Sequence, residues 1–341
     1  TLAKHYGFAL LMPQQQPANN ASGCFNWFNK GDVTRGGRGE ACSIRQMIAR
    51  MVRDYGLDRH RIYVTGLSAG GAMTSAMLAC YPEVFAAGAV IAGLPFGIAS
   101  TVREALSGMR ASSARAPHAL GDLVRGASKH AGPWPKVSVW HGSADRTVNP
   151  ANANEIVKQW LDVHQLPPAP MSEGTIDGHP HQVWWNNDGE TIVESYTIVR
   201  MAHGTPLGLA DDDERYGMQG AFMIDAGISS SYHIASFFGL TRWIEEPRPA
   251  ATESPSARLI PLVSPIPAMV PPVQMPDVVE ALWPTAIDPP RQPPKKKEVK
   301  RRALDVGARA AAGLKKLLAG ASVRPREATT ARPKRRTTTR R

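Results

Sequence analysis

Apolar and polar residues recur with two different periods over the first 245 residues of the chain. In residues 40–55 the apolar side chains return every three or four positions and Gly56 follows, which predicts an amphipathic helix with a glycine stop. Short runs rich in β-branched side chains, such as residues 61–65, instead predict strands. The pattern predicts strands over 6–13, 61–65, 86–92, 136–140, 183–185 and 191–199, and helices over 40–55, 69–80, 152–163 and 231–244.

Most of these strands are separated by helices, which is typical of an α/β fold with a mainly parallel sheet and helices on both faces. The last two strands are an exception. They are joined by a short connection that contains Asp188 and Gly189, so we expect them to form an antiparallel hairpin.

The composition changes sharply after residue 245. Residues 247–294 contain 14 of the 29 prolines, which indicates an extended linker without a packed core. Residues 291–341 carry 18 Lys and Arg against 3 Asp and Glu, a net charge of +15, while the rest of the chain has a net charge of −4. We therefore expect a folded domain over 1–245, a Pro-rich linker over 246–294 and a basic, largely disordered tail over 295–341.

Several classes of protein are disfavoured by the composition. The three cysteines, Cys24, Cys42 and Cys80, permit at most one disulfide and contain no Cys-x-x-Cys pair, so neither a disulfide scaffold nor a zinc site is indicated. No run of about 18 apolar residues predicts a membrane span. Because the positive charge belongs to the tail, the folded part does not resemble a nucleic-acid binder.

The strongest chemical signal is the sequence Gly66-Leu-Ser-Ala-Gly70, which lies between a predicted strand and a predicted helix. A Gly-x-Ser-x-Gly turn in that context raises the serine hydroxyl above the sheet, where a base can activate it as a nucleophile. Ser68 is therefore the predicted nucleophile, and a turn serine in a Gly-rich loop is the alternative. The backbone N–H of Ala69, at the start of the helix, is the predicted oxyanion donor.

An acid that orients the base should follow the nucleophile in the chain, and the base should come last. Asp145 lies just beyond the predicted strand 136–140, where functional loops of α/β proteins gather, and is the predicted acid. A turn or helix-capping role is the alternative for Asp145. Asp122 and Asp177 are weaker candidates, because neither follows a clear strand.

The base must be chosen from ten histidines. His203 directly follows the predicted strand 191–199, which is the position that a base last in sequence requires. We interpret His141 as a residue that holds the Asp145 loop in place. His179 and His181 form a His-x-His pair, a fragment of a metal site, but a surface hairpin is favoured because no third ligand is evident.

The chain resembles the poly(3-hydroxybutyrate) depolymerase family of esterases, which is related to feruloyl and acetylxylan esterases. The similar stretches, in order, are Cys24-Phe-Asn-Trp-Phe28, Val64-Thr-Gly-Leu-Ser-Ala-Gly-Gly-Ala-Met73, Tyr81-Pro-Glu-Val-Phe-Ala-Ala87, Ala92-Gly-Leu-Pro-Phe96, His141-Gly-Ser-Ala-Asp145, Met201-Ala-His-Gly-Thr-Pro206 and Gly227-Ile-Ser-Ser230. The resemblance implies an α/β-hydrolase fold and a metal-free Ser68–Asp145–His203 triad that needs no cofactor. It also implies ester substrates, an acyl-enzyme intermediate and an extracellular or periplasmic location.

The chain departs from the family pattern at both ends. Family members begin with further strands and a His-Gly loop that supplies a second oxyanion donor, and this sequence starts after that point. We therefore expect the hydrolase domain to be N-terminally incomplete, with an unpaired sheet edge. The Pro-rich and basic extension is not a part of the family's catalytic core.

The natural substrate is less constrained than the chemistry. Trp27 and Trp184 are candidates to line an apolar cleft for a polyester or aromatic acyl group, with core packing as the alternative. The leading hypothesis is a serine esterase that acts on poly- or oligo-3-hydroxyalkanoates or short acyl esters. The alternatives are a feruloyl or acetylxylan-type esterase, a serine peptidase of the same fold, and a protein that binds a polyanion, an anionic lipid or a polymer-granule surface through its basic tail.

Overall fold

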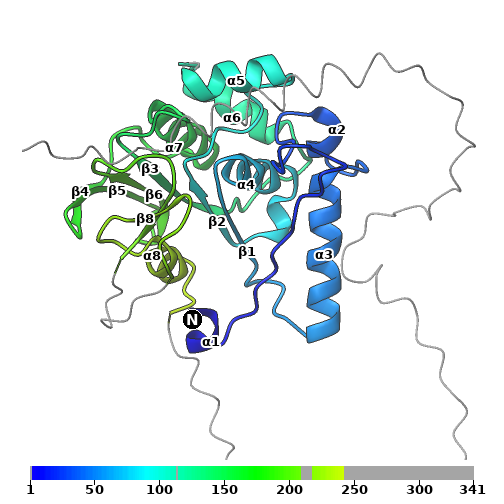
Figure 1. The fold of residues 1–341 in the computed structure, drawn as a ribbon, viewed down its shortest axis with the longest axis horizontal. Coiled ribbons are helices and arrows are strands. Elements are labelled where there is room, and N and C mark those ends of the chain that lie inside the picture. The colour runs from blue at the N-terminus through cyan, green and yellow to red at the C-terminus, as the bar shows by residue number, and fades with distance from the viewer. Residues whose placement is uncertain (1, 113, 209–216, 242–341) are drawn as a thin grey trace, which may run out of the picture.

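The computed structural model describes residues 2–112, 114–208 and 217–241 (Figure 1). The predicted Pro-rich linker, 246–294, and the predicted basic tail, 295–341, lie outside the described residues. The division of the chain into these three regions therefore stays a prediction.

A six-stranded sheet forms the centre of the described fold. Its strand order is β1-β2-β3-β6-β5-β4, and the strands from β1 to β6 in this order run parallel, while β5 and β4 are antiparallel to their neighbours. The six strands are β1 (Tyr63–Leu67), β2 (Ala87–Ile91), β3 (Lys136–Gly142), β4 (Ser172–Ile176), β5 (His179–Trp185) and β6 (Thr191–Ile198). The mainly parallel α/β sheet and the hairpin formed by β5 and β6 are both confirmed.

Helices cover both faces of the sheet. α4 (Ala69–Cys80) and α7 (Ala151–His164) pack on one face, with α3 (Glu40–Tyr55) outside α4, and α8 (Ser230–Phe237) packs on the other. In Figure 1, α5 and α6 lie at the top of the view, and α8 lies below the sheet. The remaining elements are α1 (Leu2–Tyr6), α2 (Lys30–Val33), α5 (Val102–Arg110), α6 (Pro117–Arg125), a 3₁₀ turn (Pro82–Val84) and the small parallel pair β7 (Thr205–Leu207) and β8 (Met223–Asp225).

Each face of the sheet has its own core. The core under α4 and α7 combines aliphatic side chains, such as the almost fully buried Met77, Val139 and Ile156, with the buried rings of Trp160 and Trp184. The core under α8 contains Trp140 and Tyr196, whose rings stack with centroids 3.7 Å apart. Apolar burial of this extent on both faces is the main favourable contribution to folding.

The α8 side of the sheet also holds a chain of buried polar groups. Trp140 Nε1–H donates to Ser138 Oγ (2.8 Å), and the Ser138 hydroxyl donates to Glu194 Oε1 (2.6 Å). The other carboxylate oxygen of Glu194 lies 3.3 Å from Nε2 of His181. A buried carboxylate is costly unless it is hydrogen-bonded, so these contacts explain how Glu194 is tolerated in a central strand.

One predicted strand is wrong. Residues 6–13 were expected to form a buried strand, but α1 ends at Tyr6 and no strand follows before β1. Leu10, Leu11 and Met12 are 58, 37 and 81% exposed. An apolar run becomes a strand only when a neighbouring strand accepts its backbone hydrogen bonds, and no strand of the described chain pairs with this one.

Several elements of the described chain were not predicted, among them β4, α5 and α6. β4 is an exposed, polar edge strand, so it lacks the apolar run on which strand prediction depends. α5 and α6 occupy a region of the sequence to which no element had been assigned. The last helix, α8, was predicted over 231–244 but ends at Phe237, and the Ser229 side chain caps its start by accepting the N–H of Tyr232.

No helix within the described ranges combines the length and the apolar character that a bilayer span requires.

β1 and α4 approach each other closely because residue 66 has no side chain. A Cβ added at Gly66 would lie 2.4 Å from the backbone of Gly70, whereas one added at Gly70 would meet nothing within 4 Å. The first glycine of the motif is therefore required by close packing, and the second is not.

These contacts predict opposite outcomes for two similar substitutions. Gly66→Ala forces backbone atoms apart and should lower the free energy of unfolding by about 3 kcal/mol or more. Gly70→Ala adds a methyl group to open space near the start of a helix, so it should change stability by no more than about 1 kcal/mol. Thermal and urea denaturation of the two variants measure both values, and equal destabilisation would contradict the packing described here.

Candidate active site

Ser68 lies at the sharp turn between β1 and α4. Its backbone has φ 59° and ψ −117°, a positive φ that is uncommon for a residue with a side chain. Such strained residues cost on the order of 1–3 kcal/mol and cluster at functional sites. The Ser68 N–H donates to Ile91 O at the end of β2 (2.9 Å), and Ser68 O accepts from Ala72 N in α4 (2.9 Å), so the sheet and the helix together hold the turn.

The N-terminus of α4 provides the surroundings of the Ser68 side chain. Ala69 is the first residue of this helix, and the first N–H groups of a helix have no acceptor within it. The positive end of the helix dipole adds to the attraction for negative charge at this point. The Ala69 N–H thus stands where an oxyanion donor is needed.

Asp145 lies in the loop that follows β3, and its carboxylate is fully buried. One carboxylate oxygen, Oδ1, accepts the backbone N–H groups of Thr147 (2.8 Å) and Val148 (2.9 Å). These two bonds form a turn that fixes the carboxylate in the loop. The turn role that the sequence offered as the alternative for Asp145 is therefore filled by the same carboxylate.

The other carboxylate oxygen of Asp145 binds the predicted base. His203 Nδ1 lies 2.7 Å from Asp145 Oδ2, and His203 is 6% exposed. An ionised carboxylate can only accept hydrogen bonds, so Nδ1 carries the hydrogen and donates it to Asp145. This tautomer leaves Nε2 of His203 as a proton acceptor, as a general base requires.

The surroundings of Asp145 keep it ionised. Burial alone raises the pKa of this carboxyl, but hydrogen bonds from His141 and His203, the charge of His203 and the Val148 N–H outweigh burial and hold the pKa well below its ordinary value. A carboxylate that stays charged at neutral pH is able to stabilise an imidazolium beside it.

His141 is a second imidazole at the same carboxylate. Its Nε2 lies 3.3 Å from Asp145 Oδ2 and 3.0 Å from Val148 O, and the residue is 3% exposed. The side chain thus contacts both the acid and the backbone of the acid's loop. This position agrees with the interpretation of His141 as a residue that holds the loop.

The loops that carry Asp145 and His203 are joined by several hydrogen bonds. The N–H of Ser143 donates to Ile198 O (2.9 Å), the N–H of Ala144 donates to Met201 O (3.0 Å), and the Ser143 hydroxyl accepts from the N–H of Arg200 (2.8 Å). A Cβ added at Gly142 would lie 2.3 Å from Met201 O, so this glycine allows the loops to touch. The acid and the base are therefore held as one unit.

Ser68 and the Asp145–His203 pair lie at the same edge of the sheet. The residues follow β1, β3 and β6, which all run parallel, so the three loops emerge at the carboxyl ends of these strands. Within the described residues the Ser68 hydroxyl makes no hydrogen bond. The structure thus joins His203 and Asp145 directly and places Ser68 at the same edge of the sheet. In enzymes without substrate, the hydrogen bond between nucleophile and base is often long or poorly aligned.

The two predicted substrate-binding tryptophans lie in different clusters. Trp27 is 7% exposed and packs with Ala72 and Val148, and Ala69 packs against the same cluster, which thus connects the nucleophile turn with the Asp145 loop. Trp184 is 2% exposed and lies in the core under α4 and α7. Trp184 therefore matches its core-packing alternative.

The other candidate residues have local partners. His179 Nε2 bonds to Ala226 O (2.9 Å), and His179 Nδ1 accepts the Val199 N–H (3.1 Å), while His181 faces Glu194. Across the residues that the structure describes, no three His, Cys, Asp or Glu side chains are grouped to hold a metal ion. Of the two weaker candidates for the acid, Asp122 pairs with Arg125 (2.8 Å) and Asp177 with His233 (3.3 Å).

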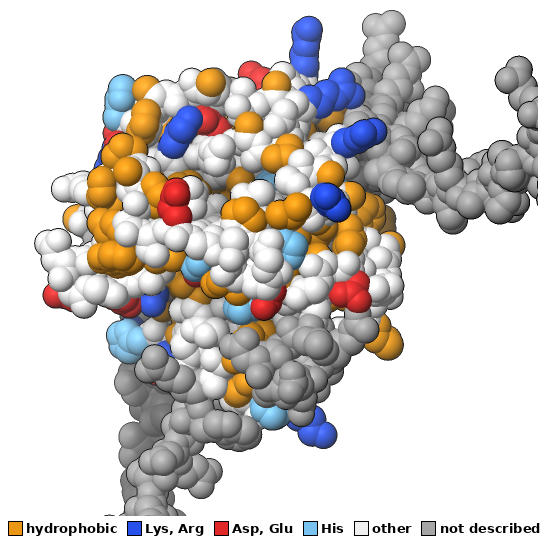
Figure 2. Space-filling model, turned by 90° about the vertical axis from the view of Figure 1, so that its left-hand side faces the viewer, with side chains coloured by type: hydrophobic (Ala, Val, Ile, Leu, Met, Phe, Trp, Pro, Cys, Tyr) orange, Lys and Arg blue, Asp and Glu red, His pale blue; other side chains and the backbone are white. Residues whose placement is uncertain are grey.

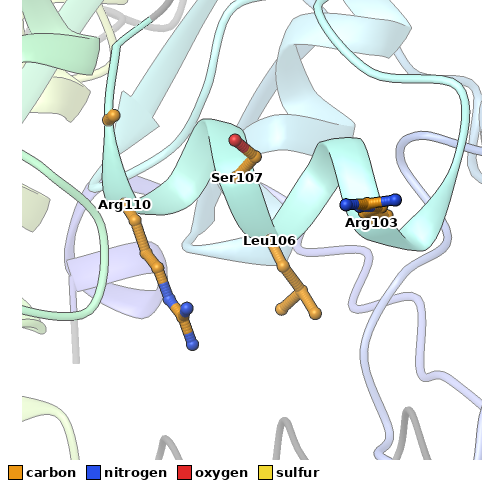
Figure 3. Close-up of a pocket in the computed structure, with 5 residues that line it drawn as sticks. Arg103, Leu106, Ser107 and Arg110 are labelled. Carbon is orange, nitrogen blue, oxygen red and sulfur yellow. The ribbon is translucent and has the colours of Figure 1, made fainter.

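A cavity of about 360 Å³ lies beside α5, away from these residues in the sequence. Leu106 and Arg110 project from the same side of the helix in Figure 3. None of the predicted catalytic residues is among the described side chains that line it. The lining residues are Arg103, Leu106, Ser107, Arg110 and Ala111.

The low pKa of Asp145 predicts how stability changes with pH. The ionised carboxylate stabilises the fold above the pKa of the unfolded chain, about 3.9, and this contribution is lost as the pH falls through the lower pKa of the folded state. We expect the wild type to exceed Asp145→Asn in free energy of unfolding at about pH 5, and the difference to shrink below about pH 4. Urea denaturation measures the difference, with Asp122→Asn as an exposed control; a difference that grows with acidification contradicts the prediction.

The chain is similar to known esterases. Residues 1–170 match the family described as Esterase PHB depolymerase. The chain is 45% identical over 240 residues to poly(3-hydroxyalkanoate) depolymerase C of Paucimonas lemoignei, with 70% of this chain and 58% of the relative covered. It is 32% identical over 209 residues to acetylxylan esterase of Coprinopsis cinerea, with 60% of this chain and 55% of the relative covered.

A solved structure of acetyl xylan esterase from Aspergillus awamori has the same fold, with a TM-score of 0.54 and 22% identity over 70% of this chain and 80% of that chain. The chain spans somewhat more than half the length of the two curated relatives named above. The described sheet and its helices form an α/β-hydrolase fold, and residues 1–170 belong to the Esterase PHB depolymerase family.

Proposed function

We propose that this chain is a serine carboxylic-ester hydrolase that acts through Ser68, His203 and Asp145. The observation that carries the proposal is the buried hydrogen bond of 2.7 Å from His203 Nδ1 to Asp145 Oδ2, at the sheet edge where the strained Ser68 turn also lies. This bond leaves His203 Nε2 free to accept a proton, which is the property that turns a serine hydroxyl into a nucleophile.

In the acylation step, Ser68 Oγ forms a bond to the ester carbonyl carbon while its proton passes to His203 Nε2. The carbonyl oxygen becomes an oxyanion and is stabilised by the Ala69 N–H at the start of α4. When the intermediate collapses, the bond to the alcohol oxygen breaks and His203 gives its proton to that oxygen. Asp145 stays ionised and stabilises the imidazolium between the two transfers.

In the deacylation step, water takes the place of the alcohol. His203 accepts a proton from the water while the water oxygen attacks the acyl carbon. The bond to Ser68 Oγ then breaks, His203 returns the proton to the serine, and a carboxylic acid is released. No cofactor is needed for either step.

We propose poly- or oligo-3-hydroxyalkanoates, or short acyl esters, as the substrate class. The 45% identity to a poly(3-hydroxyalkanoate) depolymerase supports this class, and so does the apolar cluster around Trp27 and Phe28 next to Ala69. On the face drawn in Figure 2, hydrophobic side chains are spread among polar ones, and most of the Lys and Arg side chains lie in the upper part. Acetylated xylan and feruloyl esters are the alternative substrates, and the 32% identity to an acetylxylan esterase supports the first.

Replacement of the nucleophile tests the proposal. Ser68→Ala should lower kcat for p-nitrophenyl butyrate by at least about 10⁴-fold, because no other group can accept the acyl chain. Circular dichroism should show an unchanged fold. Ser107→Ala, at an exposed serine of α5, serves as the matched control and should keep full activity.

A panel of substrates, assayed with the wild type, separates the substrate classes. Oligomers of 3-hydroxybutyrate, acetylated xylan, methyl ferulate and a peptide amide are compared at equal concentration. Hydrolysis of the oligomers above the other three supports the depolymerase assignment, and faster cleavage of the peptide replaces it with a peptidase. Unchanged turnover in Ser68→Ala removes this residue from the mechanism altogether.

We further propose that the basic tail, residues 295–341, brings the chain to a polyanion or a polymer-granule surface. The tail lies outside the described residues, and the support for its role is the net charge of +15 over residues 291–341. Binding by a dense cationic segment depends on the release of counterions, so it weakens steeply with salt.

Deletion of residues 291–341 is expected to remove most binding to DNA and to anionic vesicles at low salt, while p-nitrophenyl butyrate turnover stays unchanged. Binding of the full chain should fall at least about tenfold between 50 and 200 mM salt. Sedimentation with vesicles and a DNA filter assay measure both effects. Binding that survives both the deletion and the salt would refute the electrostatic role.

A further inference from the structure

Phe222 occupies an unusual position at the tip of a tight turn. Gly220 N bonds to Met223 O (3.2 Å) and Met223 N bonds to Gly220 O (3.1 Å), so Ala221 and Phe222 are the two central residues of the turn. Phe222 has φ 62°, while Ala221 does not have a positive φ. A positive φ at the second central position alone is typical of a type II turn, in which glycine is the usual residue.

This strained turn contacts the segment that follows His203. Phe222 O accepts the N–H of Thr205, two residues after His203, at 2.7 Å. A Cβ added at Gly204 would lie 2.8 Å from Phe222 O, so the absence of a side chain at Gly204 permits the contact. Strained backbone persists only where surrounding contacts fix it, and these contacts fix Phe222.

The ring of Phe222 meets the imidazole of His203. The two ring centroids are 6.0 Å apart and the planes are inclined by 78°, an edge-to-face arrangement. His203 is 6% exposed, whereas Phe222 is 38% exposed. The aromatic side chain therefore contacts the base on one side and remains accessible to a ligand on the other.

The chemistry of the base decides which part of an ester would meet this ring. His203 donates its proton to the alcohol oxygen when the acyl-enzyme forms, so the alcohol half of the substrate must lie beside the imidazole. A side chain in contact with this imidazole is therefore a candidate to contact the alcohol half.

We propose that Phe222 forms an apolar wall for the alcohol half of the ester and favours substrates whose alcohol carries an apolar alkyl or aryl group. This assignment rests on the ester hydrolysis proposed above. A purely structural role does not account for the residue, because glycine would adopt the same φ without strain and the ring is not enclosed in a core.

The test compares three substitutions at one position. Phe222→Ala removes the ring and keeps a side chain at positive φ, Phe222→Gly removes the ring and relieves the backbone, and Phe222→Tyr keeps an aromatic ring. Each is assayed with methyl, butyl and benzyl butyrate, in which only the alcohol changes, and with methyl acetate, butyrate and hexanoate, in which only the acyl group changes.

We expect the ratio of kcat/KM for benzyl butyrate to that for methyl butyrate to fall roughly tenfold in Phe222→Ala and Phe222→Gly. The ratio should be retained in Phe222→Tyr, and selectivity in the acyl series should stay unchanged in all three. Met218→Ser, at a residue of the same segment that is 84% exposed, is the control and should leave both series unchanged.

Several outcomes would overturn the assignment of Phe222. These are an unchanged alcohol ratio, an equal loss on all esters including the methyl ester, or a shift in the acyl series instead. Thermal denaturation checks the fold, because Phe222→Gly should be at least as stable as Phe222→Ala. Wild-type hydrolysis that persists in Ser68→Ala refutes the proposed mechanism, whereas Ser68-dependent hydrolysis with an unchanged alcohol ratio refutes the role of Phe222 alone.

Discussion

The hydrogen bond between His203 and Asp145 is the interaction on which the site depends. A charged carboxylate without exposure to water would be strongly unfavourable if it stood alone. In this fold both oxygens are satisfied, Oδ1 by two backbone N–H groups and Oδ2 by two imidazoles. The same contacts that make the buried charge tolerable also fix the tautomer of His203, so the stability of the loop and the chemistry of the base have one physical cause.

The parallel sheet brings this pair to the nucleophile. Because β1, β2, β3 and β6 run in one direction, every loop that follows one of them opens at the same edge. Residues separated by 58 positions, such as Asp145 and His203, come into contact only through this topology. The core under α4 and α7 and the core under α8 hold the sheet from both sides and so keep the edge in place.

The features that could be predicted from the sequence have local signatures. Glycines between a predicted strand and a predicted helix indicate the Ser68 turn. The loops of Asp145 and His203 follow runs of β-branched residues, which predict strands. Residues 6–13 were misjudged, because an apolar run looks the same whether or not a neighbouring strand exists to pair with it. β4 was missed for the opposite reason, since its pairing with β5 is made by the backbone of an exposed, polar segment.

The contact between Phe222 and His203 was beyond sequence reasoning for a different reason. The residues next to Phe222 in the sequence give no indication of a positive φ. Glycine is the residue usually found at this position of a type II turn. Phe222 is held by contacts with Thr205, the first residue of β7, and with Gly204 just before it, so its conformation is a property of tertiary packing.

The bonds between the loop of Asp145 and the loop of His203 also have a mechanical consequence. Acid and base are tied to each other by backbone hydrogen bonds and by the bare Cα of Gly142, whereas Ser68 belongs to a separate strand two positions away in the sheet. These bonds do not extend to the nucleophile. A movement of the Ser68 turn therefore changes the distance over which the proton passes, while the hydrogen bond between Asp145 and His203 stays intact.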